Sequence, residues 1–299
     1  MATALGSLPL PGEKERGVGK RVKVFCRILI ATAVMLFSGH AGAQGTSEPE
    51  QAYRPQVGQP GKDVVWVPTP ERLIVRMLQM ADTTSADFVM DLGSGDGRIP
   101  IAAAKRFGAR ALGIEYDPGL VQLSILAAER EGVADRVRFL RQDLFQTDFS
   151  AATVITLYLG IDTTPRLRPR LLELKPGTRV VSHQFTLGDW EPDETARVEN
   201  SPAYLWVVPA RAAGTWALKL GADAYELSMQ QQFQMIRGTA RRAGKSSPVV
   251  GGRLRGVEIR FTFIDANGDA RHLTGRVAGD TMAGVAQDQP DLKWSAQRR

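Results

Sequence analysis

The feature that most constrains the fold of this chain is a glycine-rich stretch at residues 88–98. An apolar run ends there in Asp91, and three glycines then alternate with other residues, at Gly93, Gly95 and Gly97. Glycine is required where the backbone takes a positive φ, or where a ligand must approach the chain closely. A helical pattern follows at once, and the first N–H groups of that helix would face the turn. The stretch therefore predicts a buried strand, a ligand-binding turn and a helix start.

Two carboxylates in this turn, Asp91 and Asp96, restrict the kind of ligand. They would repel a diphosphate, whereas a ligand that carries a positive centre beside a carboxylate would suit the turn. Dinucleotide-binding turns have the spacing Gly-x-Gly-x-x-Gly. In this chain the third glycine comes one residue early. NAD binding is the main alternative, and both the early glycine and Asp96 count against it.

Two further acidic residues follow the next two predicted strands. Glu115 lies 22 residues beyond Gly93, where a carboxylate can accept hydrogen bonds from both hydroxyls of a ribose. Asp143 follows the third strand and could accept a hydrogen bond from an adenine amino group. The three features come in this order along the chain, and together they are a far stronger signal than any one of them.

With this pattern, residues 64–191 resemble class I methyltransferases that depend on S-adenosylmethionine (SAM). The segment Asp91–Gly97 matches their first motif, Glu115–Asp117 their second and Gln142–Leu144 their third. The resemblance implies a Rossmann-like parallel sheet, SAM as the cofactor and transfer of its methyl group to a nucleophile.

The segment Val64–Glu71, which precedes the first motif, narrows the resemblance. Its Val-Pro-Thr-Pro-Glu sequence is similar to that of mitochondrial lysine methyltransferases that act on the ATP synthase c-subunit and the adenine nucleotide translocase, and of their bacterial relatives. The resemblance implies that the segment closes over SAM, whereas the alternative for Trp66 is a hydrophobic strap on the core. The implied cofactor residues are Trp66, Pro68, Thr69, Asp91, Gly93, Ser94, Gly95, Asp96, Gly97, Glu115, Tyr116, Asp143 and Leu144.

Apolar runs and helical patterns alternate along residues 64–210, as in an α/β fold with a parallel sheet. In such sheets the ligand lies at the carboxyl ends of the strands, where Gly93, Glu115 and Asp143 all fall. Residues 203–209 predict the last strand, at the edge of the sheet. We expect the other strands at 87–92, 110–115, 136–141, 153–159 and 178–184, and helices at 72–80, 98–107, 118–131 and 164–174.

The end of the fourth strand is where class I methyltransferases meet their acceptor. Tyr158 and Asp162 are the candidate catalytic residues there, although Tyr158 could instead be a core aromatic residue. His183, near the end of the fifth strand, is a further candidate, and a purely structural histidine is the alternative. The chain has no Asn-Pro-Pro-Tyr tetrapeptide of amino-directed nucleic-acid methyltransferases, and no cluster that predicts a metal site.

The acceptor stays open at this point. The narrower resemblance implies a lysine amine of a protein, and a small-molecule acceptor is also compatible with the sequence. The alternative function is an exported binding protein on a methyltransferase-like scaffold, in which the C-terminal domain binds the ligand or partner.

Residues 1–43 predict a signal peptide. Basic residues precede a short apolar run at 28–37, and Ala41-Gly42-Ala43 fits a cleavage site. The run is too short to span a bilayer of ~30 Å comfortably, so we expect no membrane span after cleavage. The predicted location is the periplasm; the alternatives are an uncleaved anchor or a mistaken start codon, the latter implying the cytoplasm. Residues 44–63 predict a flexible linker.

The net charge of +6 comes largely from this leader, which holds six basic and two acidic residues. The rest of the chain is nearly neutral and gives little reason to expect a nucleic-acid partner.

Residues 211–299 predict a separate antiparallel β domain. Apolar and polar residues alternate at 225–229, 257–263 and 272–277, and a hairpin turn is expected at 265–269. Short phrases at 214–216 and 279–284 weakly resemble a small lipocalin-like barrel. The domain shows no catalytic cluster, which favours a structural or substrate-docking role.

Overall fold

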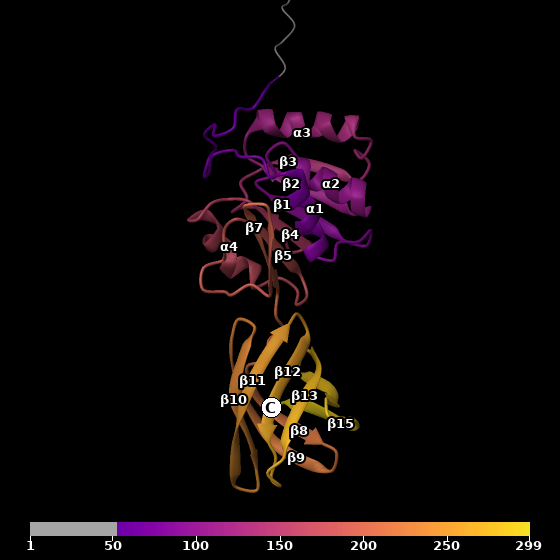
Figure 1. Cartoon of the computed structure of the whole chain (residues 1–299), viewed down its shortest axis with the longest axis vertical. Coiled ribbons are helices and arrows are strands. Elements are labelled where there is room, and N and C mark those ends of the chain that lie inside the picture. Colours follow the sequence, from indigo (N-terminus) through magenta and orange to yellow (C-terminus); the bar gives the residue numbers. More distant parts are fainter. Residues whose placement is uncertain (1–52) are drawn as a thin grey trace, which may run out of the picture. The chain divides into compact units, whose positions relative to one another are not determined.

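The computed structural model describes residues 53–299, which form an α/β part followed by a closed antiparallel β-barrel (Figure 1). This confirms the predicted fold class. The predicted signal peptide, residues 1–43, and linker residues 44–52 lie outside the described residues. No helix in the described part is long and apolar enough to cross a membrane.

The α/β part is built on a seven-stranded sheet in the order β3-β2-β1-β4-β5-β7-β6. The first five strands are parallel, and β7 pairs antiparallel with both β5 and β6, so β7 alone runs against the other six strands. Strand order reverses between β1 and β4, and this switch point opens a crevice at the carboxyl ends of the two strands. The strands are β1 (Phe88–Leu92), β2 (Arg110–Glu115), β3 (Val137–Arg141), β4 (Val154–Leu157), β5 (Arg179–His183), β6 (Glu194–Val198) and β7 (Ser201–Val207).

The edge of the sheet corrects one expectation. Residues 203–209 were predicted to form the edge strand, but β7 lies between β5 and β6, and β6 is the edge. The sequence of β6 is Glu-Thr-Ala-Arg-Val, and its side chains are only half-buried or exposed. It therefore lacks the apolar run by which the central strands were recognised.

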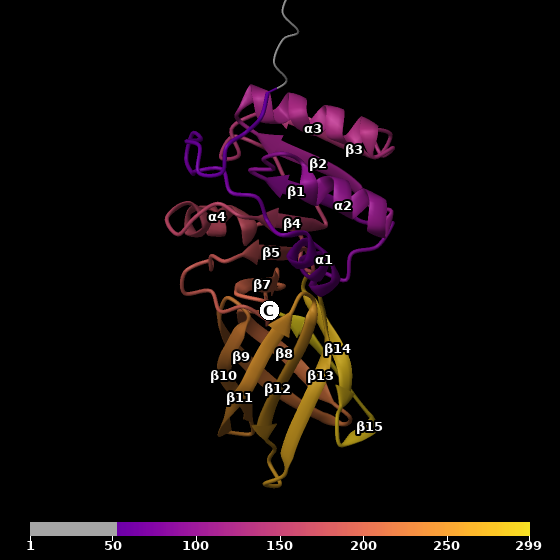
Figure 2. The same ribbon diagram turned by 45° about the horizontal axis from the view of Figure 1, so that its top comes forward.

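Four helices cover the sheet: α1 (Glu71–Met80), α2 (Arg98–Phe107), α3 (Pro118–Arg130) and α4 (Thr163–Leu171). Apolar residues of α1, α2 and α3 pack on one face with Val89, and those of α4 pack on the other with Met90 (Figure 2). Asp117 caps α3 by accepting hydrogen bonds from the N–H groups of Gly119 and Leu120.

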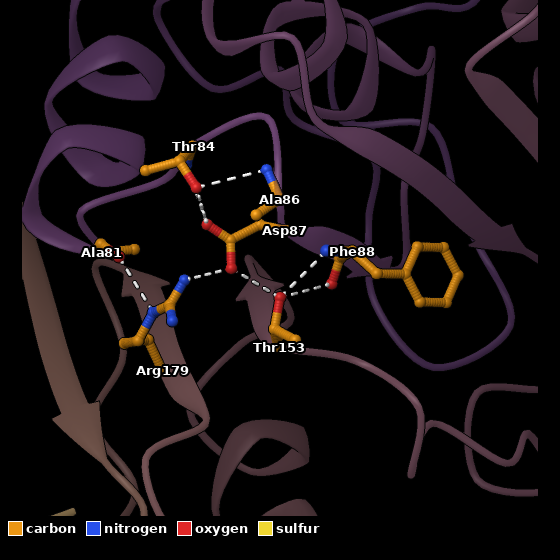
Figure 3. Close-up of polar contacts among 7 residues, drawn as sticks. All are labelled: Ala81, Thr84, Ala86, Asp87, Phe88, Thr153 and Arg179. Atoms are coloured by element: carbon orange, nitrogen blue, oxygen red, sulfur yellow. Dashed lines mark hydrogen bonds and ion pairs between the residues drawn. The ribbon is translucent and has the colours of Figure 1, made fainter.

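A buried polar network ties the amino end of β1 to its neighbours (Figure 3). The Asp87 carboxylate accepts hydrogen bonds from Thr84 N at 2.8 Å and from Thr153 Oγ1 at 2.7 Å, and it pairs with the Arg179 guanidinium. Arg179 also donates to the Ala81 carbonyl at the end of α1. The network joins α1, β1, β4 and β5 at the end of the sheet opposite the crevice.

The barrel closes through pairing of its first and last strands and has a filled interior. Trp216, Tyr225, Phe261, Phe263 and Trp294 are all buried in it. The inside is therefore a packed core, and it offers no lumen for a ligand. Its strands are β8 (Gly214–Leu220), β9 (Asp223–Gln232), β10 (Met235–Arg242), β11 (Lys245–Arg255), β12 (Glu258–Ile264), β13 (Ala270–Ala278), β14 (Thr281–Ala286) and β15 (Gln289–Arg298).

The three predicted barrel strands are present as β9, β12 and β13, and the predicted hairpin turn joins the last two. The other five strands were not predicted. In three of them, β10, β11 and β14, glycine interrupts the alternation that reveals a strand. At Gly238, for example, a Cβ atom would lie 1.9 Å from the Ser228 carbonyl oxygen. Close approach of neighbouring strands requires glycine at that position.

Candidate active site

The glycine turn folds across the carboxyl ends of β1 and β2. Gly93, Gly95 and Gly97 have φ values of 79°, 54° and 78°, all in the left-handed region that favours glycine. The N–H groups of Gly93 and Ser94 both donate to the Ile114 carbonyl. A Cβ atom at Gly95 would lie 2.6 Å from the indole nitrogen of Trp66, so glycine is also needed for this close contact.

Glu115 is fixed at the end of β2 by backbone donors. Its Oε2 accepts from Gly95 N at 2.8 Å, and its Oε1 accepts from Tyr116 N at 2.7 Å and Asp117 N at 3.0 Å. A carboxylate has about four acceptor positions. Glu115 therefore braces the glycine turn and still has acceptor capacity for a ligand hydroxyl in the pocket.

Asp143 follows β3 and lies on the other side of the same pocket. Its Oδ1 accepts from Phe145 N at 2.9 Å, and its Oδ2 pairs with the ammonium of Lys62 at 2.9 Å. The hydrogen bond between Lys62 and Asp143 is the main reason that the pKa of Asp143 is lowered. The same bond is the main reason that the pKa of Lys62 is raised.

Lys62 belongs to a folded segment, residues 58–69, that we call the strap. Gly58 N donates to the Trp66 carbonyl at 2.8 Å, and Trp66 N donates to the Gln59 carbonyl at 2.9 Å. These bonds close a turn over the pocket. The strap thus includes residues 58–63, which the sequence assigned to the end of a linker.

The pocket brings together residues from the strap and from the ends of β1, β2, β3 and β4. Of the predicted cofactor residues, only Gly97 is not part of the lining; it precedes α2, and a Cβ atom there would lie 2.6 Å from the ring of Phe139. The predicted residues that line the pocket are Trp66, Pro68, Thr69, Asp91, Gly93, Ser94, Gly95, Asp96, Glu115, Tyr116, Asp143 and Leu144.

Asp91, at the end of β1, is almost completely buried in the pocket wall. Burial raises its pKa to about 8; the hydrogen bond from Thr156 Oγ1, at 2.6 Å, opposes this, and the charges of Glu115 and Asp96 add to it. Asp96 itself is paired with Arg98, whose Nη1 also donates to the Thr69 carbonyl at 3.1 Å. Arg98 therefore links the glycine turn to the strap, a role that the sequence did not reveal.

A neutral aromatic group lies beside the pocket at the ends of β4 and β5. The rings of Tyr158 and His183 stack with their centroids 3.8 Å apart, and the ring of Phe185 stacks with that of Tyr158 at a centroid distance of 6.0 Å. Burial lowers the pKa of His183 to about 4 and raises that of Tyr158, so both side chains are uncharged at neutral pH. His183 Nδ1 lies 3.2 Å from Thr69 Oγ1 and so joins β5 to the strap.

The two predicted catalytic residues lie in different environments. Tyr158 lines the pocket and is half-buried. Asp162 is exposed, immediately precedes α4 and is not part of the pocket lining. The geometry therefore brings Tyr158, but not Asp162, to the cofactor pocket, with His183 directly behind it.

Comparison with known proteins places the α/β part of the chain among methyltransferases. Residues 91–194 match the family model of the ANTKMT methyltransferase domain, which includes none of the barrel. A protein-lysine N-methyltransferase of Saccharolobus islandicus is 42% identical over 151 residues, which cover 48% of this chain and 94% of that protein. The lysine N-methyltransferase of the ATP synthase c-subunit from Xenopus laevis is 37% identical over 129 residues.

The extent of these matches differs. The Xenopus match covers 43% of this chain and 56% of that protein, so the chain spans about half the length of this relative. Among solved structures, an RNA methyltransferase from Salinibacter ruber, crystallised with S-adenosyl-L-homocysteine, is 51% identical. It covers 48% of this chain and 95% of its own, with a TM-score of 0.48.

Proposed function

This chain belongs to the methyltransferase family of the ANTKMT domain, and we propose that it methylates the side-chain amine of a lysine in a protein. It is a SAM-dependent methyltransferase with a class I fold. The observation that carries the choice of acceptor is the uncharged aromatic wall of Tyr158, His183 and Phe185 beside the cofactor pocket. The name of the Saccharolobus relative supports the same acceptor.

The residues of the pocket fit SAM. Glu115 has free acceptor capacity for a ribose hydroxyl, and Asp143 can accept from an adenine amino group. Glycine at positions 93 and 95 lets Leu159 and Trp66, which also line the pocket, pack directly on the turn, where a Cβ atom would lie 2.5 Å and 2.6 Å from them. Asp91 lies where the ammonium of the methionine part can neutralise a buried carboxylate.

When bound, SAM supplies an electrophilic methyl group on a positively charged sulfur. The task of the chain is to present a lysine amine with a free electron pair. Removing the proton of a lysine of pKa ~10.4 at pH 7 costs about 4.6 kcal/mol. Burial beside the neutral rings of Tyr158 and His183 disfavours the ammonium form and reduces this cost. The phenol of Tyr158 can then orient the amine, and correct orientation can contribute ~7–11 kcal/mol.

Asp162 has a different proposed role. Its carboxylate is exposed at the start of α4, four residues after Tyr158. It can attract a lysine ammonium before the amine enters the pocket, but it is not placed to contact the reacting atoms. The alternative function, an exported binding protein on a methyltransferase-like scaffold, gains no support from this site, because the glycine turn, Glu115 and Asp143 are all in place.

The function is tested by incubating the full chain with methyl-labelled SAM and a cell extract, followed by hydrolysis of the products. We expect label in N-methyl-lysine and loss of the labelled macromolecules on protease treatment. Label in methylated nucleosides, removed by nuclease instead, would contradict the proposed acceptor. Tyr158→Phe should lower the rate at least about tenfold with unchanged SAM affinity; Tyr204→Phe, on β7, is the matched control.

SAM binding should release protons from Asp91. Its pKa of about 8 means that free Asp91 is protonated at pH 7, while the cofactor ammonium favours the carboxylate. Calorimetry in buffers of different ionisation enthalpy should detect this release, and SAM affinity should rise with pH until about pH 8. Asp91→Asn should bind SAM more weakly and without proton release. A wild-type protein that binds SAM equally well from pH 6 to pH 8 would refute the assignment.

The same raised pKa affects the unliganded protein. Between the ordinary aspartate pKa of ~3.9 and about 8, the folded protein holds a proton that the unfolded chain has released. The contribution of Asp91 to the free energy of unfolding therefore falls as the pH rises through this window.

A further inference from the structure

The ammonium of Lys62 pairs with Asp143, one of the residues of the cofactor pocket that we expect to bind the ligand. Asp143 Oδ1 is engaged by the backbone of Phe145, and Oδ2 has Lys62 as its hydrogen-bond partner in the described part of the chain. Lys62 Nζ also lies 3.3 Å from Asp63 and 5.4 Å from the centre of the Tyr116 ring. Asp143 and Tyr116 both line the pocket, so the lysine reaches into it from the strap.

Asp143 stands where the adenine end of SAM must lie. Glu115, at the end of β2, is braced against the glycine turn and marks the ribose position. Asp143, just beyond the end of the neighbouring strand β3, is the carboxylate next along the sheet. An adenine amino group that donates to Asp143 Oδ2 would have to approach the same oxygen from the pocket into which Lys62 reaches, so the two donors crowd one another there although the oxygen has a second lone pair.

We propose that Lys62 competes with the adenine amino group for Asp143 and thereby lowers the affinity for SAM. Adenine binding replaces the ammonium as a donor to Oδ2, and Lys62 turns to Asp63, with which it already shares a contact. The exchange removes the one side-chain ion pair between the strap and the end of β3 among the described residues. Binding of SAM should therefore break the contact between the strap and Asp143 at Lys62.

The competition is modest in size because the pair is partly exposed. The side chains of Lys62 and Asp143 are 34% and 16% exposed. Ion pairs of this kind contribute little free energy and are screened by salt. We therefore expect the pair to change the dissociation constant for SAM by roughly two- to fivefold. Removing Lys62 should therefore strengthen SAM binding slightly, whereas removing a side chain that binds SAM, such as Glu115, should weaken it strongly.

Lys62→Met keeps most of the length of the side chain and removes its charge. We expect the dissociation constant for SAM, measured by calorimetry on the full chain, to fall roughly two- to fivefold. Lys62→Arg should behave like the wild type, because it retains the charge. Lys105→Met, which breaks the exposed pair with Glu131 away from the pocket, is the matched control and should leave SAM affinity unchanged.

Salt dependence gives a second readout. Salt weakens the attraction between SAM and the pocket carboxylates in both proteins, but in the wild type it also weakens the competing Lys62–Asp143 pair. The loss of SAM affinity between low and high salt should therefore be smaller in the wild type than in Lys62→Met.

Adenosine and purine riboside separate competition from other effects, because purine riboside lacks the amino group. Competition experiments against SAM should show that Lys62→Met improves adenosine binding and leaves purine riboside binding unchanged. An equal change for both nucleosides, no change, or weaker SAM binding by Lys62→Met would overturn the proposal. None of these measurements needs a methyl acceptor, so their outcome is independent of the proposed lysine substrate.

Discussion

Glu115→Ala should weaken SAM binding at least about 100-fold and abolish the rise in melting temperature that SAM produces in the wild type. The substitution removes a carboxylate that accepts from three backbone N–H groups and that we expect to accept from the ribose of bound SAM. Hydrogen bonds to a charged group contribute about 1.5–3 kcal/mol each, so the loss of one ribose bond, together with the loss of the brace on the glycine turn, accounts for this factor. Calorimetry gives the affinity, and thermal unfolding with and without SAM gives the stabilisation.

Glu115→Gln separates the two roles of this side chain. It keeps one acceptor oxygen and loses the charge, so its SAM affinity should lie between those of the wild type and Glu115→Ala. Asp117→Asn, two residues further on, keeps an oxygen that can cap α3 and serves as a folding control. A Glu115→Ala protein that is folded and binds SAM within about threefold of the wild type would refute the assigned ribose position.

Asp87→Ala should lower the free energy of unfolding by about 3–5 kcal/mol, the largest stability effect that we expect from a single polar side chain in this sheet. Asp87 is buried, and its removal leaves the Arg179 guanidinium and Thr84 N without their carboxylate partner. The bonds in this network link α1 to three strands, so their loss affects the whole α/β part (Figure 3). Denaturant unfolding measures the change.

The pH dependence of stability gives a matching signature. Burial opposes ionisation of Asp87, but hydrogen bonds from Thr153, Thr84 and Arg179 outweigh it and lower the pKa of the carboxyl group. Its contribution is therefore present above the unfolded pKa of ~3.9 and is lost as the pH falls through the lower folded value. Asp87→Ala should lack this acid-induced loss, whereas Arg72→Ala, which breaks an exposed pair with Glu199, should cost less than about 1 kcal/mol and retain it. A loss below about 1 kcal/mol in Asp87→Ala would contradict the account.

The central strands and the cofactor pocket were predictable because both depend on short-range patterns. Each parallel strand is an apolar run, and the acidic residues Glu115 and Asp143 stand at or directly after the ends of two of them. In a parallel sheet the carboxyl ends of neighbouring strands meet at one edge, so order along the chain translates into proximity. Tyr158 reached the pocket by the same rule.

What the sequence did not reveal depends on contacts between distant segments. Lys62 and Asp143 are 81 residues apart, and a lysine in a polar, proline-containing stretch gives no signal of its partner. No local sequence pattern around Arg98 predicts its hydrogen bond to the Thr69 carbonyl. Strand β6 is polar enough to resemble a loop, and three barrel strands are interrupted by glycines that only their pairing explains.

The most direct test of the account is a calorimetric titration of the full chain with SAM. We predict one SAM bound per chain in the micromolar range, with proton release at pH 7 that disappears in Asp91→Asn. That result would place the cofactor in the pocket formed by the glycine turn, Glu115 and Asp143. A well-folded protein that takes up no SAM would contradict the account, and the outer surface of the barrel would then be the place to search for function.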